Sequence, residues 1–180
     1  MDILDLLLVG VEVSIALAGF AGIIATYQIN DRTMTRRGPV GALTVIVQFS
    51  LGVAMFCSIC ICLIAFEVVG KTLWAITSLI GAALYVSLAF GIVRMMRGAI
   101  VKKSVRFLFM LLQGIGALIA IGMILNSLNL VFHREPGPIV AGIIYALSVA
   151  AFMFSRLLLQ PLWKAVREQE AKNSTVGSQG

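Results

Sequence analysis

The sequence predicts an all-α integral membrane protein, a bundle of five transmembrane helices. Of its 180 residues, 60% are apolar and 12% are charged, and the mean hydropathy is +1.03, far outside the range of soluble globular proteins. Five apolar runs reach the length of about 20 residues that a helix needs to cross a bilayer. The basic residues fall in short clusters between these runs. The net charge of +6 therefore indicates membrane topology, and no nucleic-acid partner is expected.

The first predicted helix covers residues 3–29. The start of the chain, MDILDLLLVG, has no basic segment and no small-residue cleavage site, so we expect this helix to remain rather than to be removed as a signal peptide. The segment NDRTMTRRGP separates it from the second helix. The other four predicted helices cover residues 40–69, 72–96, 105–132 and 139–163.

The segments between these four helices are short. The second helix follows Pro39, and the fifth follows Pro136 and Pro138, where the missing N–H of proline costs least. Gly70 and Lys71 alone separate the second helix from the third. The segment RGAIVKKS separates the third from the fourth, and HREPGP separates the fourth from the fifth.

The basic residues predict the orientation, because cytoplasmic loops carry an excess of Lys and Arg. With the N-terminus outside, all of the 14 basic residues except Lys71 and Arg134 face the cytoplasm. The prediction is therefore N-out and C-in, with residues 1–163 in the membrane domain. Residues 164–180 are expected to form a short cytoplasmic helix that ends in a mobile tail over residues 173–180. The expected location is the inner (plasma) membrane of a bacterium.

An acidic residue, Glu12, interrupts the first apolar run. It lies seven residues after Asp5, or about 10 Å beneath the outer interface at the helical rise. A charge at the bilayer centre costs about 2.5–3.5 kcal/mol on insertion scales, so an intramembrane acid is a functional candidate by default. The alternatives are that the side chain is protonated or that it is tied to a partner for packing alone.

The fourth predicted helix supplies possible partners for Glu12. Asn126, Asn129 and His133 are spaced i, i+3 and i+7, so they share one helical face. Asn126 lies at the same predicted depth as Glu12. Together these residues are candidates to relay protons or to bind a cation. The alternative is that the amides cap a helix end and that His133 belongs to a loop.

Small residues repeat at every fourth position in the first two helices, which lets helix backbones approach closely in a membrane. In the first helix Glu12 shares a face with Ala16 and Gly19, so that helix is expected to be central in the bundle or at a subunit interface. The helix-packing candidates are Gly10, Ser14, Ala18, Gly19, Gly22, Ser50, Ala54 and Ser58.

Three further groups of residues carry weaker signals. Gln48 and Gln113 are secondary candidates, either for hydrogen bonds between helices or for a polar path. Cys57, Cys60 and Cys62 are interpreted as small packing residues, because nothing nearby completes a set of metal ligands; no metal and no cofactor is expected. A basic cluster at the connection between the third and fourth helices is expected to bind anionic lipid headgroups. The alternative is that this cluster only determines the topology. That cluster consists of Arg94, Arg97, Lys102, Lys103 and Arg106.

No enzyme motif is present: the sequence has no HExxH, no P-loop, no GxSxG and no glycine-rich dinucleotide turn. Two hypotheses follow. The favoured one is an oligomeric channel or transport protein for protons or small cations that uses Glu12. The other is a structural or accessory subunit that packs against a larger membrane complex, so the expected partners are the lipid bilayer and either further copies of the chain or another membrane protein. Residues 15–23, IALAGFAGI, resemble stretches in small bacterial multipass proteins of unknown function, a resemblance that implies no activity.

Overall fold

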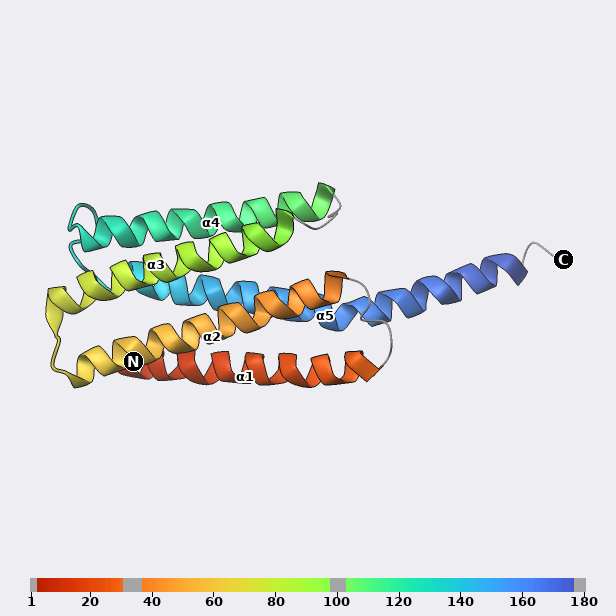
Figure 1. Ribbon diagram of the computed structural model, residues 1–180, viewed down its shortest axis with the longest axis horizontal. Helices are drawn as coiled ribbons and strands as arrows, with labels where there is room; N and C mark the ends of the chain where they lie inside the picture. The colour runs from red at the N-terminus through yellow and green to blue at the C-terminus, as the bar shows by residue number, and fades with distance from the viewer. Residues whose placement is uncertain (1–2, 31–36, 98–102, 177–180) are drawn as a thin grey trace.

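The computed structural model describes residues 3–30, 37–97 and 103–176, with side chains over residues 3–26, 43–94 and 107–159 (Figure 1). It confirms the all-α bundle, because the described residues form five helices that reverse direction at each connection. All five are long and apolar enough to cross a membrane. The helices are α1 (Ile3–Asn30), α2 (Arg37–Ala65), α3 (Gly70–Arg97), α4 (Lys103–Ser127) and α5 (Gly137–Val176).

The two ends of the chain lie at opposite ends of the bundle, as an odd number of spans requires (Figure 1). The N-terminal end of α1 lies beside the α2–α3 and α4–α5 connections. The C-terminus extends from the other end. This arrangement agrees with the predicted alternation of the spans, whereas the assignment of one end to the cytoplasm stays a prediction from the basic residues.

Helices α2 and α5 form the centre of the bundle. Helix α5 contacts all four other helices, and α2 contacts α1, α3 and α5. Two clusters of buried side chains fill the centre. One includes Phe49, Ile92 and Met153, and the other includes Phe56 and Ile143.

The outer surface of the helices is rich in large apolar side chains, among them Phe90, Phe107 and Leu118. A monomeric soluble protein rarely exposes such a continuous apolar surface. Lipid tails solvate it at no cost, so the surface fits a protein in contact with the bilayer.

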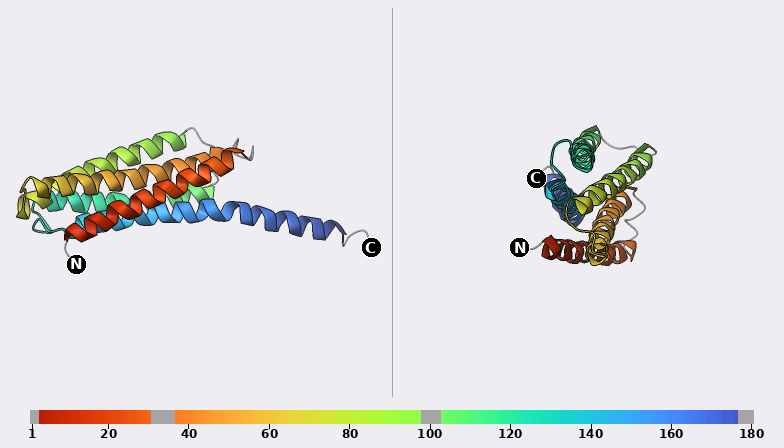
Figure 2. Two further views of the ribbon diagram at one scale, coloured as in Figure 1. Left: turned by 90° about the horizontal axis from the view of Figure 1, so that it is seen from below. Right: turned by 90° about the vertical axis from the view of Figure 1, so that its left-hand side faces the viewer.

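Helix α1 lies at the edge of the bundle, so the first of its two expected positions, the centre of the bundle, is wrong, and a position at a subunit interface stays a prediction. It contacts α2 and α5, and it contacts neither α3 nor α4. The end-on view in Figure 2 places α1 and α4 on opposite sides of the molecule. The reason is that α1 packs on one side of the central helices α2 and α5, whereas the hairpin of α3 and α4 packs on their other side.

The second and fourth helices end earlier than predicted, at residue 65 instead of 69 and at residue 127 instead of 132. Each end is a Schellman motif, in which one residue in the left-handed conformation stops the helix. Glu67 has a φ of 60°; its N–H donates to the carbonyl of Ile64, and the N–H of Val68 donates to that of Leu63. Apolar residues continue past both stops, which is why hydropathy alone placed the ends too late.

Glycine at position 67 is expected to stabilise the protein, because a left-handed conformation costs an L-residue about 1–2 kcal/mol that glycine avoids. For Glu67→Gly we expect a gain of about 0.5–1 kcal/mol in the free energy of unfolding, measured by SDS titration in mixed micelles. Gly70, with a φ of 67°, is the matched control. Gly70→Ala is expected to lose about 1 kcal/mol, and a destabilised Glu67→Gly protein would contradict this account of the helix end.

The fifth helix continues well beyond the predicted end at residue 163. Helix α5 runs without a break through Pro161 to Val176, so the C-terminal extension is part of α5 and not a separate short helix. It projects from the bundle at the C-terminal end (Figure 2). Residues 173–176, expected to be part of a mobile tail, belong to this helix, and residues 177–180 lie outside the described residues.

Candidate functional site

Glu12 lies on the outward face of α1. Its side chain is exposed, and no hydrogen bond or ion pair joins it to any side chain that the structure describes. The apolar span of α1 covers Ile3–Thr26, which puts Glu12 about 4 Å from the midpoint at a rise of 1.5 Å per residue. The acid is thus close to the middle of the predicted span, and it has no partner among the side chains that the structure describes.

The opposite face of α1 attaches the helix to the bundle. Leu7, Gly10, Ser14 and Ala21 are buried there. A Cβ at Gly10 would lie 3.1 Å from the Sγ of Cys57, so glycine permits the close approach of α1 to α2. The Ser14 hydroxyl donates to the carbonyl of Gly10 at 2.6 Å, so it needs no partner on another helix.

The small-residue rows change faces along each helix, because four residues turn a helix by about 400° and each step rotates the row by about 40°. Gly10 and Ser14 are buried, Ala18 is half-buried, and Gly22 is exposed. Ser50 is buried, Ala54 is half-buried, and Ser58 is exposed. The rows therefore pack helices only at their buried ends.

At its C-terminal end, the small-residue row on α1 reaches the exposed side of the helix, near the face that carries Glu12. Nothing lies within 4 Å of a Cβ built at Gly19 or Gly22. Ala16 and Ile23 are also exposed on this face. A carboxyl group and several small residues together thus form the unoccupied side of α1.

Asn126 is not a partner of Glu12. Its side chain is fully buried, and its Nδ2 donates to the Oγ of Ser78 at 2.8 Å and to the carbonyl of Glu135 at 2.9 Å. The N–H of Glu135 donates back to the Oδ1 of Asn126 at 3.1 Å. These bonds tie α4 to α3 and to the α4–α5 connection, so the shared depth of Glu12 and Asn126 corresponds to no contact across the bundle.

Asn129 and His133 do not continue a helical face with Asn126, so that expectation is wrong. Helix α4 ends at Ser127, and Asn129, with a φ of 60°, is the left-handed residue of its Schellman motif. His133 and Arg134 also have positive φ. Asn129 and His133 are both exposed in this connection, which corresponds to the alternative of a helix end and a loop.

The two glutamines lie in different environments. Gln48 is exposed on α2. Gln113, on α4, is half-buried, and the Tyr85 hydroxyl donates to its backbone carbonyl at 2.9 Å, with its Oε1 at 3.4 Å. Gln113 therefore takes part in a contact between helices rather than in a line of polar residues across the membrane.

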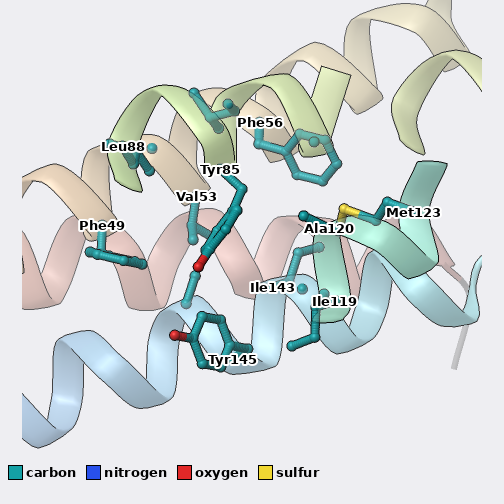
Figure 3. Close-up of a pocket in the computed structure, with 15 residues that line it drawn as sticks. Phe49, Val53, Phe56, Tyr85, Leu88, Ile119, Ala120, Met123, Ile143 and Tyr145 are labelled. Atoms are coloured by element: carbon teal, nitrogen blue, oxygen red, sulfur yellow. The ribbon is translucent and has the colours of Figure 1, made fainter. Parts of the chain in front are cut away.

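A tyrosine pair, missed at the sequence level, joins three helices around Gln113. Tyr145, on α5, donates to the carbonyl of Leu112 at 2.6 Å, next to the carbonyl that Tyr85 of α3 uses. The two rings meet edge to face with centroids 6.5 Å apart (Figure 3). The signal in the sequence is a tyrosine at the middle of an apolar run, where a hydroxyl needs an acceptor.

Two of the three cysteines agree with the packing interpretation, because Cys57 and Cys60 belong to a buried apolar cluster. Cys62 is exposed and does not belong to that cluster. Within the described part of the chain, no three His, Cys, Asp or Glu side chains come together as metal ligands. Of the predicted headgroup-binding residues, Arg94 is exposed, and the side chains of Arg97, Lys102, Lys103 and Arg106 lie outside the described residues.

The fold, the five spans and the apolar outer surface define a small multipass integral membrane protein. Comparison with models of protein families, with curated proteins and with solved structures gives no match to this chain. Its function therefore has to be argued from its own residues.

Proposed function

We propose that this protein is a non-enzymatic assembly subunit of a membrane complex in the bacterial inner membrane, and that the outward face of α1 docks another transmembrane helix. The observation that carries the proposal is the position of Glu12, exposed near the middle of the span and without a partner among the described residues. Lipid tails offer no hydrogen bonds to a carboxyl group. A helix that brings an amide, a hydroxyl or a basic side chain to this depth would provide them.

The shape of the same face supports docking. Ala16, Gly19 and Gly22 leave open space beside Glu12, and small residues at a helix surface let a second backbone come close. The buried face of α1 already holds the helix in its bundle. A change on the outward face is therefore expected to affect assembly while the fold of the subunit remains.

A bulky residue at Gly19 tests the docking face. We expect Gly19→Leu to abolish the specific complex in nanodiscs or native membranes, detected by in-membrane cross-linking and native mass spectrometry, because leucine fills the space a second helix would use. Gly91→Leu on α3 is the matched control, since its Cβ also meets nothing within 4 Å. An unchanged complex in the Gly19→Leu protein would contradict docking through this face.

The second candidate function is the oligomeric channel or transport protein for protons or small cations. The observation that favours it is again Glu12 near the midpoint of α1, because copies of the chain arranged around an axis would bring several such acids to one depth. Because α1 and α4 of one chain do not contact each other, a relay from Glu12 through Asn126 and His133 would have to pass between copies of the chain. Transport would therefore have to use α1 faces from several copies.

Glu12→Gln separates the two functions. Glutamine keeps the size and one acceptor oxygen, replaces the other oxygen with an NH2 donor, and removes the titrating group. An assembly subunit is expected to form its complex almost unchanged, whereas a transport protein is expected to lose proton or cation flux in liposomes while remaining assembled. Absence of flux in the correctly assembled wild-type protein would remove the transport function.

A further inference from the structure

A cavity lies between the α3–α4 hairpin and the central helices α2 and α5 (Figure 3). Its free volume is about 60 Å³, and it forms a recess that is partly open to the surroundings. Val53 and Gly81 line it within two residues of the midpoints of their spans, Leu43–Ala65 and Gly70–Arg94. The recess is therefore at the depth of the lipid tails.

The walls of the cavity are apolar. Phe56, Met123 and Ile143 line it, and these side chains are 4%, 5% and 5% exposed. The only side-chain oxygens among the lining residues are the hydroxyls of Tyr85 and Tyr145, and both already donate to carbonyls of α4. The cavity therefore gives a polar ligand or a water molecule too few partners, since a buried water needs two to four.

One wall of the cavity is adjustable. Met123 lies against Gly81 and Gly142, whose missing side chains make room for its thioether. Methionine is unbranched and fills irregular space well, which suits a wall that adapts to an inserted chain. The hairpin of α3 and α4 meets the rest of the bundle at this position, so an occupant would lie between two groups of helices.

We propose that this cavity binds the terminal part of a phospholipid acyl chain, which enters from the bilayer through the open side of the recess. At this depth in the bilayer, the recess opens toward the hydrocarbon tails of the lipids. An apolar pocket whose hydroxyls are already bonded favours hydrocarbon over any polar occupant. The bound chain would fill the space between the hairpin and the central helices and hold the two groups of helices together.

Photolabelling of the full-length protein tests the proposal. The probe is a phosphatidylcholine with a diazirine near the end of one acyl chain, in nanodiscs of palmitoyl-oleoyl phosphatidylcholine. We expect cross-links to the buried Met123 and Phe56 as well as to Leu118, which is 70% exposed and lies near the midpoint of the span Phe107–Ser127. A probe with the diazirine next to the headgroup is expected to leave Met123 and Phe56 unlabelled. Labelling confined to exposed residues such as Leu118 would overturn the proposal. A second probe, an isoprenoid alcohol that carries a diazirine, would also overturn it by labelling the cavity when the phosphatidylcholine probe does not.

Two alanines on α4 give a matched pair of variants. Ala120 lines the cavity and is 5% exposed, whereas Ala117 is exposed to the surroundings. Ala120→Phe places a ring in the cavity and is expected to lower labelling of Phe56 by about tenfold. This factor corresponds to an acyl chain that can no longer bury roughly two of its methylene groups. Ala117→Phe is expected to leave it unchanged. A folded Ala120→Phe protein with unchanged labelling would overturn the proposal, and if this variant does not fold, the comparison of the two wild-type probes decides.

Discussion

Leucine in place of Asn126 is expected to destabilise the protein by about 2–3 kcal/mol, because it removes several buried hydrogen bonds at once. Leucine has a similar size but leaves the Oγ of Ser78 and the carbonyl of Glu135 without the hydrogen bonds from Asn126. The N–H of Glu135 loses its bond to Asn126 but keeps one to the carbonyl of Phe132. All three groups belong to one junction between α3, α4 and the α4–α5 connection. The measurement is the free energy of unfolding in SDS–lipid mixed micelles, with circular dichroism as the signal.

The control for Asn126→Leu is Asn129→Gly. Asn129 is also an amide at this end of α4, but it is exposed and has a φ of 60°. Glycine accepts this conformation, so the expected change is within about 0.5 kcal/mol or slightly stabilising. Equal losses in the two variants would contradict the special role of Asn126. A neutral Asn126→Leu variant would show that the buried network contributes nothing to the stability of the junction.

Alanine at Gly116 is expected to cost about 1–3 kcal/mol, which is typical of a side chain forced into a packed contact. The methyl group would overlap the ring and the hydroxyl of Tyr85. Tyr85 would have to move away and would lose its hydrogen bond to Gln113. The same unfolding measurement applies, and the contact between α3 and α4 is the one expected to weaken.

Gly114→Ala is the matched control for Gly116→Ala. Both glycines lie in α4, two residues apart, but nothing lies within 4 Å of a Cβ at Gly114. Its replacement is expected to stabilise the helix by up to about 1 kcal/mol through helix propensity. Tyr85→Ala should remove most of the penalty of Gly116→Ala in a double-mutant cycle. A penalty that persists without Tyr85 would show that a different contact makes Gly116 necessary.

The spans were predictable because a transmembrane helix is a local structure. Its backbone hydrogen bonds lie within one segment, so a run of apolar residues of sufficient length is enough to specify it. The residues on α1 that share a face with Glu12 also followed from the helical period alone, and Ala16, Gly19 and Ile23 are all exposed with it. The helical period does not indicate whether a given face packs against another helix or is exposed to lipid.

The helix ends needed the structure, because hydropathy does not respond to backbone conformation. Glu67 and Asn129 stop their helices through a left-handed conformation inside apolar surroundings. Asparagine is sometimes found at the left-handed position that ends a helix, so the residue type at position 129 was compatible with a helix end. Glutamate at residue 67 gave none, and the spacing of Asn126, Asn129 and His133 suggested a face that the chain does not form.

From the order of its residues alone, this chain determined five membrane helices, their alternating directions and an acid inside the first of them. The tertiary structure decided which helices are neighbours: it put α1 at the edge, away from α4, and joined Tyr85 and Tyr145 to the carbonyls of α4. The reason is that lipid and protein are almost equally apolar, so apolar character does not distinguish a helix face that packs from one that meets lipid. Close approach at Gly10 and Gly116 and the pairing of buried polar groups make that distinction, and both depend on segments far apart in the chain.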